Sequence, residues 1–90
     1  MNKIHVTVKY LGTFSQLTAR RQEAVELDEG ATVDVLTWKL VQRYGRELKK
    51  RLVDNETRPV LFLVADRPAD GDWELSDGDE VLLTYPAGGG

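Results

Sequence analysis

Apolar and polar residues alternate strictly near the start of the chain, and few structures other than a β-strand accommodate this spacing. In an extended strand every second side chain lies on the same face, whereas a helix would scatter the same residues around its axis. The pattern therefore predicts a strand over residues 3–10 with one buried face and one polar face. The side chains expected on the buried face are Ile4, Val6, Val8 and Tyr10.

A second short strand is predicted downstream, before the turn residues 28–30, and it would form a hairpin with the first. Phe14 and Leu17, three positions apart in the long connecting loop, match one helical turn that packs onto the core. The side chains of the second strand expected to share one face are Glu23, Val25 and Leu27.

A helix is predicted over residues 33–44, because apolar residues there recur every three or four positions. The Thr32 hydroxyl can cap its first turn, and Gly45 can adopt the left-handed conformation that ends helices. Residues 47–52 can add a further turn or two. The apolar residues that repeat along the main helix are Val33, Leu36, Leu40 and Tyr44.

Two more strands are predicted in the second half of the chain. Residues 60–65 are apolar without alternation, which indicates a strand covered on both faces or one whose outer face awaits a partner. Residues 80–85 form the last strand, and Pro86 stops the sheet because it has no N–H to donate.

The order strand, strand, helix, strand, strand predicts an α+β roll, a mixed sheet of four to five strands with one main helix across one face. We expect a single domain over residues 1–86. Residues 87–90, Ala-Gly-Gly-Gly, are expected to form a flexible tail because they carry no apolar anchor.

Composition excludes several kinds of function. The chain has 90 residues, no cysteine and one histidine, so a disulfide, a thiolate metal site, a cysteine nucleophile and a multi-histidine metal site are all impossible. The net charge of −3 gives no general attraction to nucleic acid or to an anionic membrane. With neither a signal peptide nor a membrane span apparent, we expect a cytoplasmic protein.

The three terminal glycines have no explanation in folding, because they cost ordering entropy and add no packing. Fully extended, residues 87–90 would reach at most about 13–14 Å beyond the domain. That length can place the carboxylate of Gly90 inside another protein's active site through a channel that admits only bare backbone. The alternative is a frayed end or a linker remnant.

Three segments of the chain resemble the MoaD/ThiS-type sulfur carriers, which have the ubiquitin-like β-grasp fold. They are the capped helix start at residues 32–36, the Asp-Gly-Asp-Glu-Val segment at 77–81, and the short spacing from Val81 through Pro86 to Gly89-Gly90. The closest resemblance is to the small subunit of molybdopterin synthase. The resemblance implies a carrier rather than a catalyst, with no cofactor of its own.

In such a carrier, an adenylating enzyme of the ubiquitin-activating type would use ATP to activate the carboxylate of Gly90. A sulfurtransferase would then supply the sulfur that makes a thiocarboxylate. Gly88 and Gly89, with Pro86 and Ala87, would occupy the partner's channel. A larger molybdopterin synthase subunit is a further expected partner. Which product receives the sulfur, and whether Gly90 is instead joined to a lysine as in a ubiquitin-like modifier, stay open. A third hypothesis, a β-grasp interaction module with an inert tail, also stays open.

Partner docking is expected on the sheet face opposite the helix. The leucines and phenylalanine of residues 61–63 and 82–83 must divide between the two faces, and parity alone does not say which set faces the helix. The residues predicted to dock a partner are Phe62, Leu83 and Tyr85, with Phe62 as a core residue the alternative. Charge is also uneven: residues 66–80 hold seven acids and one base, and residues 43–51 hold five bases and one acid. An acidic surface next to the tail could steer it to a basic partner site.

Overall fold

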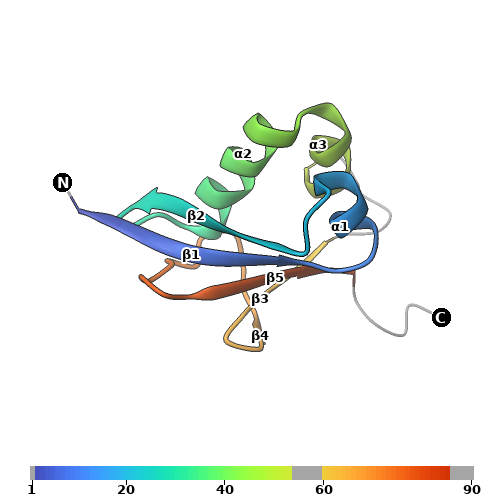
Figure 1. The fold of residues 1–90 in the computed structure, drawn as a ribbon. Coiled ribbons are helices and arrows are strands. Elements are labelled where there is room, and N and C mark those ends of the chain that lie inside the picture. The colour runs from blue at the N-terminus through green and yellow to red at the C-terminus, as the bar shows by residue number, and fades with distance from the viewer. Residues whose placement is uncertain (1, 54–59, 86–90) are drawn as a thin grey trace.

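The computed structural model describes residues 2–53 and 60–85, and Figure 1 shows their arrangement. β1 and β2 form an antiparallel hairpin, as the alternation predicts, and the connecting loop contains the short helix α1. The elements run in the order β1 (Lys3–Tyr10), α1 (Thr13–Thr18), β2 (Gln22–Asp28), α2 (Val33–Tyr44), α3 (Arg46–Leu52), β3 (Leu61–Val64), β4 (Arg67–Pro68) and β5 (Glu80–Thr84).

The five strands form one mixed sheet in the order β2-β1-β5-β3-β4. β5 pairs in parallel with β1 and antiparallel with β3, so the last of these strands occupies the middle of the sheet. α1, α2 and α3 all lie over the same face, and none of the described helices covers the other face (Figure 1). This is the ubiquitin-like β-grasp fold, and the predicted fold class is confirmed.

The core lies between the helices and this one sheet face. The buried apolar side chains are at most 6% exposed, and Val8, Phe14, Leu36, Val81 and Leu83 are completely buried. The alternating residues predicted to face inward from β1 and β2 are all buried. Burial of this single continuous cluster is the main stabilising contribution, because apolar burial contributes about 25 cal/mol per Å².

Both predicted ends of α2 are confirmed. The hydroxyl oxygen of Thr32 accepts a hydrogen bond from the backbone N–H of Val35 at 3.3 Å. Gly45 ends the helix with φ of 85°, a conformation that L side chains rarely adopt, and α3 begins at the next residue. The change of direction at Gly45 carries α3 to the end of the sheet where β5 finishes.

β4 was not predicted. Only the two residues Ala65 and Asp66 connect β3 to β4, and their φ values are 52° and 65°. Two successive positive φ angles are typical of a tight hairpin turn, which usually has glycine or asparagine there. The turn therefore has no sequence signal, and Pro68 is tolerated because β4 is an edge strand.

Candidate functional site

The end of β5 brings three side chains together at the last described residue. The Tyr85 ring packs on the Phe14 ring, with ring centroids 5.1 Å apart and an interplanar angle of 34°. Arg51, in the last turn of α3, places Nη1 3.4 Å from the Tyr85 hydroxyl oxygen. We call Phe14, Arg51 and Tyr85 the tail root, because only Pro86 separates Tyr85 from the predicted tail at 87–90.

The tail root joins three parts of the fold: Phe14 belongs to α1, Arg51 to α3, and Tyr85 directly follows β5. Phe14, in the first turn of α1, is completely buried, and the Thr18 hydroxyl donates to its carbonyl oxygen at 2.9 Å. The backbone N–H of Leu11 donates to the carbonyl oxygen of Leu83 at 3.2 Å, which ties the start of the α1 loop to β5. The direction in which the chain leaves the sheet is therefore fixed by the fold.

The predicted channel residues lie beyond this point. Pro86, Ala87, Gly88, Gly89 and Gly90 are outside the described residues, and their roles stay predictions. The same holds for the predicted boundary between a domain at 1–86 and a tail at 87–90. Tyr85, the third residue predicted to dock a partner, is half-buried at the tail root.

The sheet face without helices carries an apolar patch of three leucines. Leu63 pairs with Leu82 across β3 and β5, and Leu61 occupies the same face two residues away. All three side chains are partly exposed, and Leu63 and Leu82 line a hollow of about 170 Å³. We call Leu61, Leu63 and Leu82 the open-face patch.

The structure corrects two of the predicted docking residues. Leu83 is completely buried in the core, so its side chain is not available to a partner. Phe62 pairs with Leu83 and therefore points to the helix side, where it packs against the core and lines a hollow of about 420 Å³ beside α2. Phe62 and Leu83 thus lie on the helix side and not on the opposite sheet face where docking is expected, and the apolar run 60–65 has no alternation that could have shown this.

A buried carboxylate joins β1, β2 and α2 near the same end of the sheet. Glu23 accepts hydrogen bonds from the hydroxyls of Tyr10, at 2.6 Å, and Tyr44, and it forms an ion pair with Arg43. Burial raises the pKa of Glu23. The hydrogen bonds from the two tyrosines and Arg43 together lower it by more, so the pKa lies below its ordinary value. Burial, together with the Glu23 carboxylate, raises the pKa of Tyr10.

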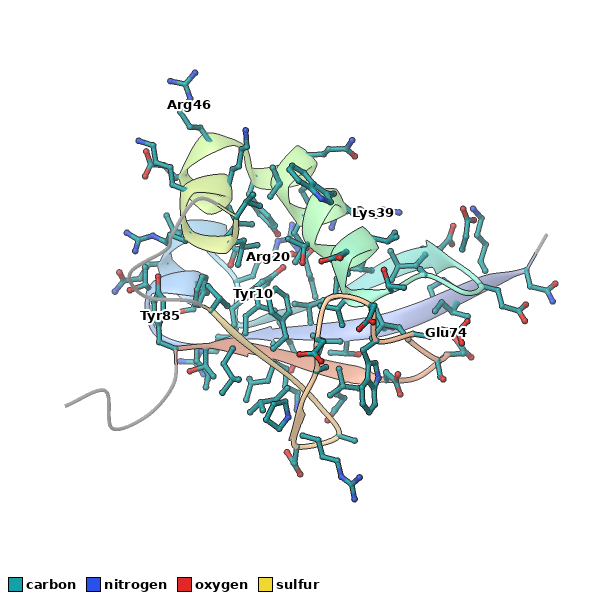
Figure 2. The ribbon with its side chains drawn as sticks, turned by 180° about the vertical axis from the view of Figure 1, so that it is seen from behind. Tyr10, Arg20, Lys39, Arg46, Glu74 and Tyr85 are labelled. Atoms are coloured by element: carbon teal, nitrogen blue, oxygen red, sulfur yellow. The ribbon has the colours of Figure 1, made fainter. Side chains whose placement is uncertain are left out.

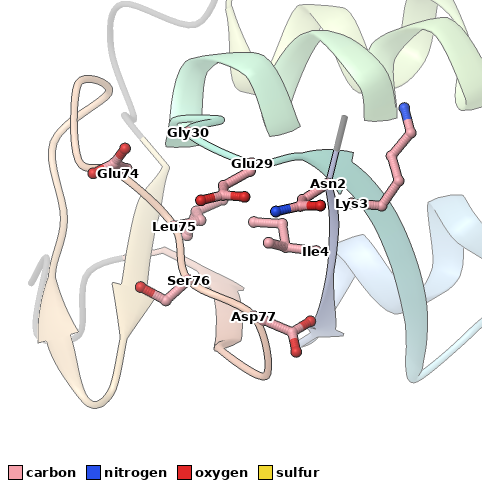
Figure 3. Close-up of a pocket in the computed structure, with 9 residues that line it drawn as sticks. All are labelled: Asn2, Lys3, Ile4, Glu29, Gly30, Glu74, Leu75, Ser76 and Asp77. Atoms are coloured by element: carbon pink, nitrogen blue, oxygen red, sulfur yellow. The ribbon is translucent and has the colours of Figure 1, made fainter.

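A hollow of about 480 Å³ lies between the start of β1, the turn after β2 and residues 74–77, and Figure 3 shows the side chains that line it. Carboxylates of Glu29, Glu74 and Asp77 line it. Asp77 has a structural task there, because its Oδ1 accepts the backbone N–H of His5 at 2.8 Å. Across residues 2–53 and 60–85, no group of three or more His, Asp or Glu side chains is arranged to hold a metal ion.

Charge is separated along the sheet. The acidic segment 66–80 leads into the beginning of β5, whereas the tail root lies at its end beside α3. Figure 2 shows Tyr85 and Arg46 at one end of the molecule and Glu74 at the other. The acidic segment therefore lies away from Tyr85, the last described residue before the tail, and the helix beside Tyr85 is rich in basic residues instead.

None of the helices in the described ranges is long and apolar enough to cross a membrane.

Comparisons with known proteins agree with this arrangement. A model of the ThiS family matches residues 8–90. The structure of the putative molybdopterin converting factor subunit 1 from Pyrococcus furiosus is 35% identical, with a TM-score of 0.80, and the match covers 93% of this chain and 99% of that one. No curated protein matches the chain significantly.

Two further solved structures share the fold at lower identity. Small archaeal modifier protein 1 from Haloferax volcanii is 23% identical, with a TM-score of 0.78, over 93% of this chain and 99% of that one. A chain of the BexX/CysO complex of Amycolatopsis orientalis is 24% identical, with a TM-score of 0.70, over 94% of this chain and 99% of that one.

Proposed function

The chain belongs to the ThiS family, and from that premise we propose that it carries sulfur as a thiocarboxylate on the terminal carbon of Gly90. At the family level it is a small sulfur carrier or ubiquitin-like modifier rather than a catalyst. The observation that carries the proposal is the family match over residues 8–90, which includes the whole Gly-Gly-Gly end.

The chemistry needs two partners. The carboxylate oxygen of Gly90 attacks the α-phosphorus of an ATP held by an adenylating enzyme, and pyrophosphate leaves. Sulfur at the oxidation level of sulfide, delivered by a sulfurtransferase, then attacks the carbonyl carbon and expels AMP. A C–S bond replaces a C–O bond with no net oxidation. This chain supplies the reacting carbon and the surface that orients it.

We place the carrier in molybdopterin synthesis, with a larger synthase subunit as the partner that uses the thiocarboxylate. Support comes from the 35% identity to the putative molybdopterin converting factor subunit 1, over nearly the full length of both chains. The modifier alternative, in which a lysine amine attacks activated Gly90, is supported by the common fold with small archaeal modifier protein 1.

Intact mass of the protein isolated from its native host tests the carrier proposal. We expect a fraction heavier by the difference between sulfur and oxygen, localised to the C-terminal peptide. Conjugates to other proteins through Gly90, without the heavier free form, would establish the modifier instead. The encoded mass alone, together with no adenylation by the host's activating enzyme and ATP, would leave an interaction module with an inert tail.

We propose that the adenylating enzyme docks on the open-face patch. Replacement of Leu63 by serine is expected to raise the KM for the carrier about tenfold, since burial of one leucine contributes roughly 1.5 kcal/mol. ATP-pyrophosphate exchange at increasing carrier concentration measures this KM. The matched control is Ala24→Ser. Ala24 is in β2, on the same face of the sheet as Leu63 but outside the patch.

A KM unchanged by Leu63→Ser in a folded domain would remove the patch from the interface. A larger KM increase from Phe62→Ala than from Leu63→Ser, again in a folded domain, would return docking to the helix side. The structure predicts instead that Phe62→Ala acts mainly on stability, because this side chain packs against the core.

A further inference from the structure

Five exposed cations surround the end of the molecule from which the tail leaves. Arg46, Lys49 and Lys50 belong to α3, the helix whose Arg51 contacts Tyr85. Arg20 and Arg21 follow α1, which packs against α3. The carbonyl oxygen of Arg21 accepts the N–H of Tyr10, at the end of β1 that lies beside the end of β5. We call Arg20, Arg21, Arg46, Lys49 and Lys50 the basic end.

Most of these charges form no ion pair with another described residue. Within the described ranges, no ion pair holds Arg20, Arg21, Arg46 or Lys49. Lys50 lies 3.8 Å from Glu47, but both side chains are more than 60% exposed, and such a pair contributes little. The nearby carboxylate of Glu23 is already occupied by Arg43.

The stability of α3 accounts for only part of this cluster. Arg46 is three and four residues from Lys49 and Lys50, and like charges at these spacings destabilise a helix by about 0.2–0.5 kcal/mol per pair. A cation in the first turn, as Arg46 is, also opposes the helix dipole. Lys49 and Lys50, in the last turn, favour the dipole, so the cost comes from the position of Arg46 and from the like-charge pairs.

We propose that the basic end docks against an acidic protein surface that surrounds the channel into which the tail inserts. This inference rests on the proposed function and adds the chemistry of the partner's surface. With carboxylates concentrated at the far end, the molecule has a charge asymmetry along the sheet, and an acidic rim attracts it tail first. The open-face patch supplies contact area, and the basic end orients the carrier toward the channel and raises the rate of association.

A nucleic acid is the other class of polyanion that a basic surface can attract. The net charge of −3 opposes it, and single-stranded nucleic acid also needs aromatic platforms for its bases. The exposed aromatic side chains in the described part of the chain are Trp38 and Trp73, and neither belongs to α1, α3 or the turn before β2. The observations therefore favour a protein.

The test uses the host's adenylating enzyme and full-length carrier variants in ATP-pyrophosphate exchange at two salt concentrations. For Arg46→Glu/Lys49→Glu we expect KM for the carrier to rise about tenfold or more at about 20 mM salt, falling below about twofold at about 500 mM. The kcat should not change. The glutamate introduced at position 46 interacts favourably with the dipole of α3, and the one introduced at position 49 interacts unfavourably. The two effects on stability roughly cancel, so we expect the fold to be retained.

The matched control is Asp72→Lys/Glu74→Lys, which reverses two exposed charges at the far end. Its KM is expected to stay within about twofold of wild type, because these residues lie away from the docking end. A KM lowered by Asp72→Lys/Glu74→Lys as much as it is raised by Arg46→Glu/Lys49→Glu would mean that only net charge matters, and it would overturn the inference.

Three other outcomes count against it. Equal KM values for wild type and Arg46→Glu/Lys49→Glu at both salt concentrations would overturn the inference while leaving the carrier function intact. No adenylation of wild type at all would overturn the proposed function and the inference with it. Retention of a single-stranded RNA oligonucleotide by wild type at low salt, lost in Arg46→Glu/Lys49→Glu, would assign the basic end to nucleic acid.

Discussion

Removal of Gly89 and Gly90 is expected to lower adenylation by at least about 1,000-fold while leaving stability unchanged. Displacement of a reacting group by about 1 Å can cost about 100-fold in rate, and two residues of extended chain span about 7 Å. The shortened terminus would still carry a carboxylate, but it would not reach the nucleotide. ATP-pyrophosphate exchange measures the loss, and urea unfolding checks the fold.

The control for this deletion is Gly88→Ala, which keeps the length of the tail and adds one methyl group. If the width of the tail matters in the channel, the adenylation rate of Gly88→Ala is lower than that of wild type but higher than that of the deletion. Adenylation at the wild-type rate after the deletion would show that Gly90 is not the activated group. An interaction module would instead bind its partner equally well with and without the two glycines.

Replacement of Glu23 by alanine is expected to lower the free energy of unfolding by about 2–4 kcal/mol. The hydroxyl of Tyr10, whose side chain is almost completely buried, would lose its hydrogen-bond acceptor, and a cavity would remain between β2 and α2. Tyr44 would lose the same acceptor and Arg43 its ion-pair partner. Urea unfolding at neutral pH measures the change.

The matched control is Glu26→Ala, on the same strand but exposed on the opposite face, and we expect it within about 0.5 kcal/mol of wild type. An equal loss in both variants would mean that strand propensity, rather than the buried network, sets the effect. A loss below that of Glu26→Ala would show that the tyrosine hydroxyls find other partners.

The Glu23 network also predicts how stability depends on pH. The pKa of Glu23 in the folded protein lies below its ordinary value of 4.5, so its contribution is complete above about 4.5 and is lost as the pH falls through the folded pKa. A Glu23→Gln variant has no such titration. Its stability deficit relative to wild type should therefore shrink on acidification below about 4.5, and a constant deficit would contradict the assigned pKa shift.

The helical and strand elements could be predicted where side chains repeat with one clear period. The predicted strand at 3–10 and helix at 33–44 match β1 and α2 at both ends. The β3–β4 hairpin could not be predicted, because Ala65 and Asp66 adopt positive φ without the glycine or asparagine that usually marks such a turn. The pairing of β3 with β4 outweighs the unfavourable backbone conformation of these two residues.

The candidate site divides in a similar way. The glycines at 88–90 pointed to tail chemistry from their residue type alone. The docking face depends on which neighbours flank β5, and only the register shows that Leu82 lies opposite Leu63 while Leu83 lies opposite Phe62. The basic and acidic stretches could be counted from the sequence, but their distance from the tail depends on the direction of β5, which its parallel pairing with β1 sets.

The central place of β5 has a mechanical consequence. A tail held in a partner's channel transmits any pull directly to this strand, which is hydrogen-bonded to β1 on one edge and to β3 on the other. Because the bonds between strands run across the pulling direction, a force along β5 loads both rows in shear at once instead of opening them one by one. The domain can thus be withdrawn repeatedly from a tight channel without unravelling from its functional end.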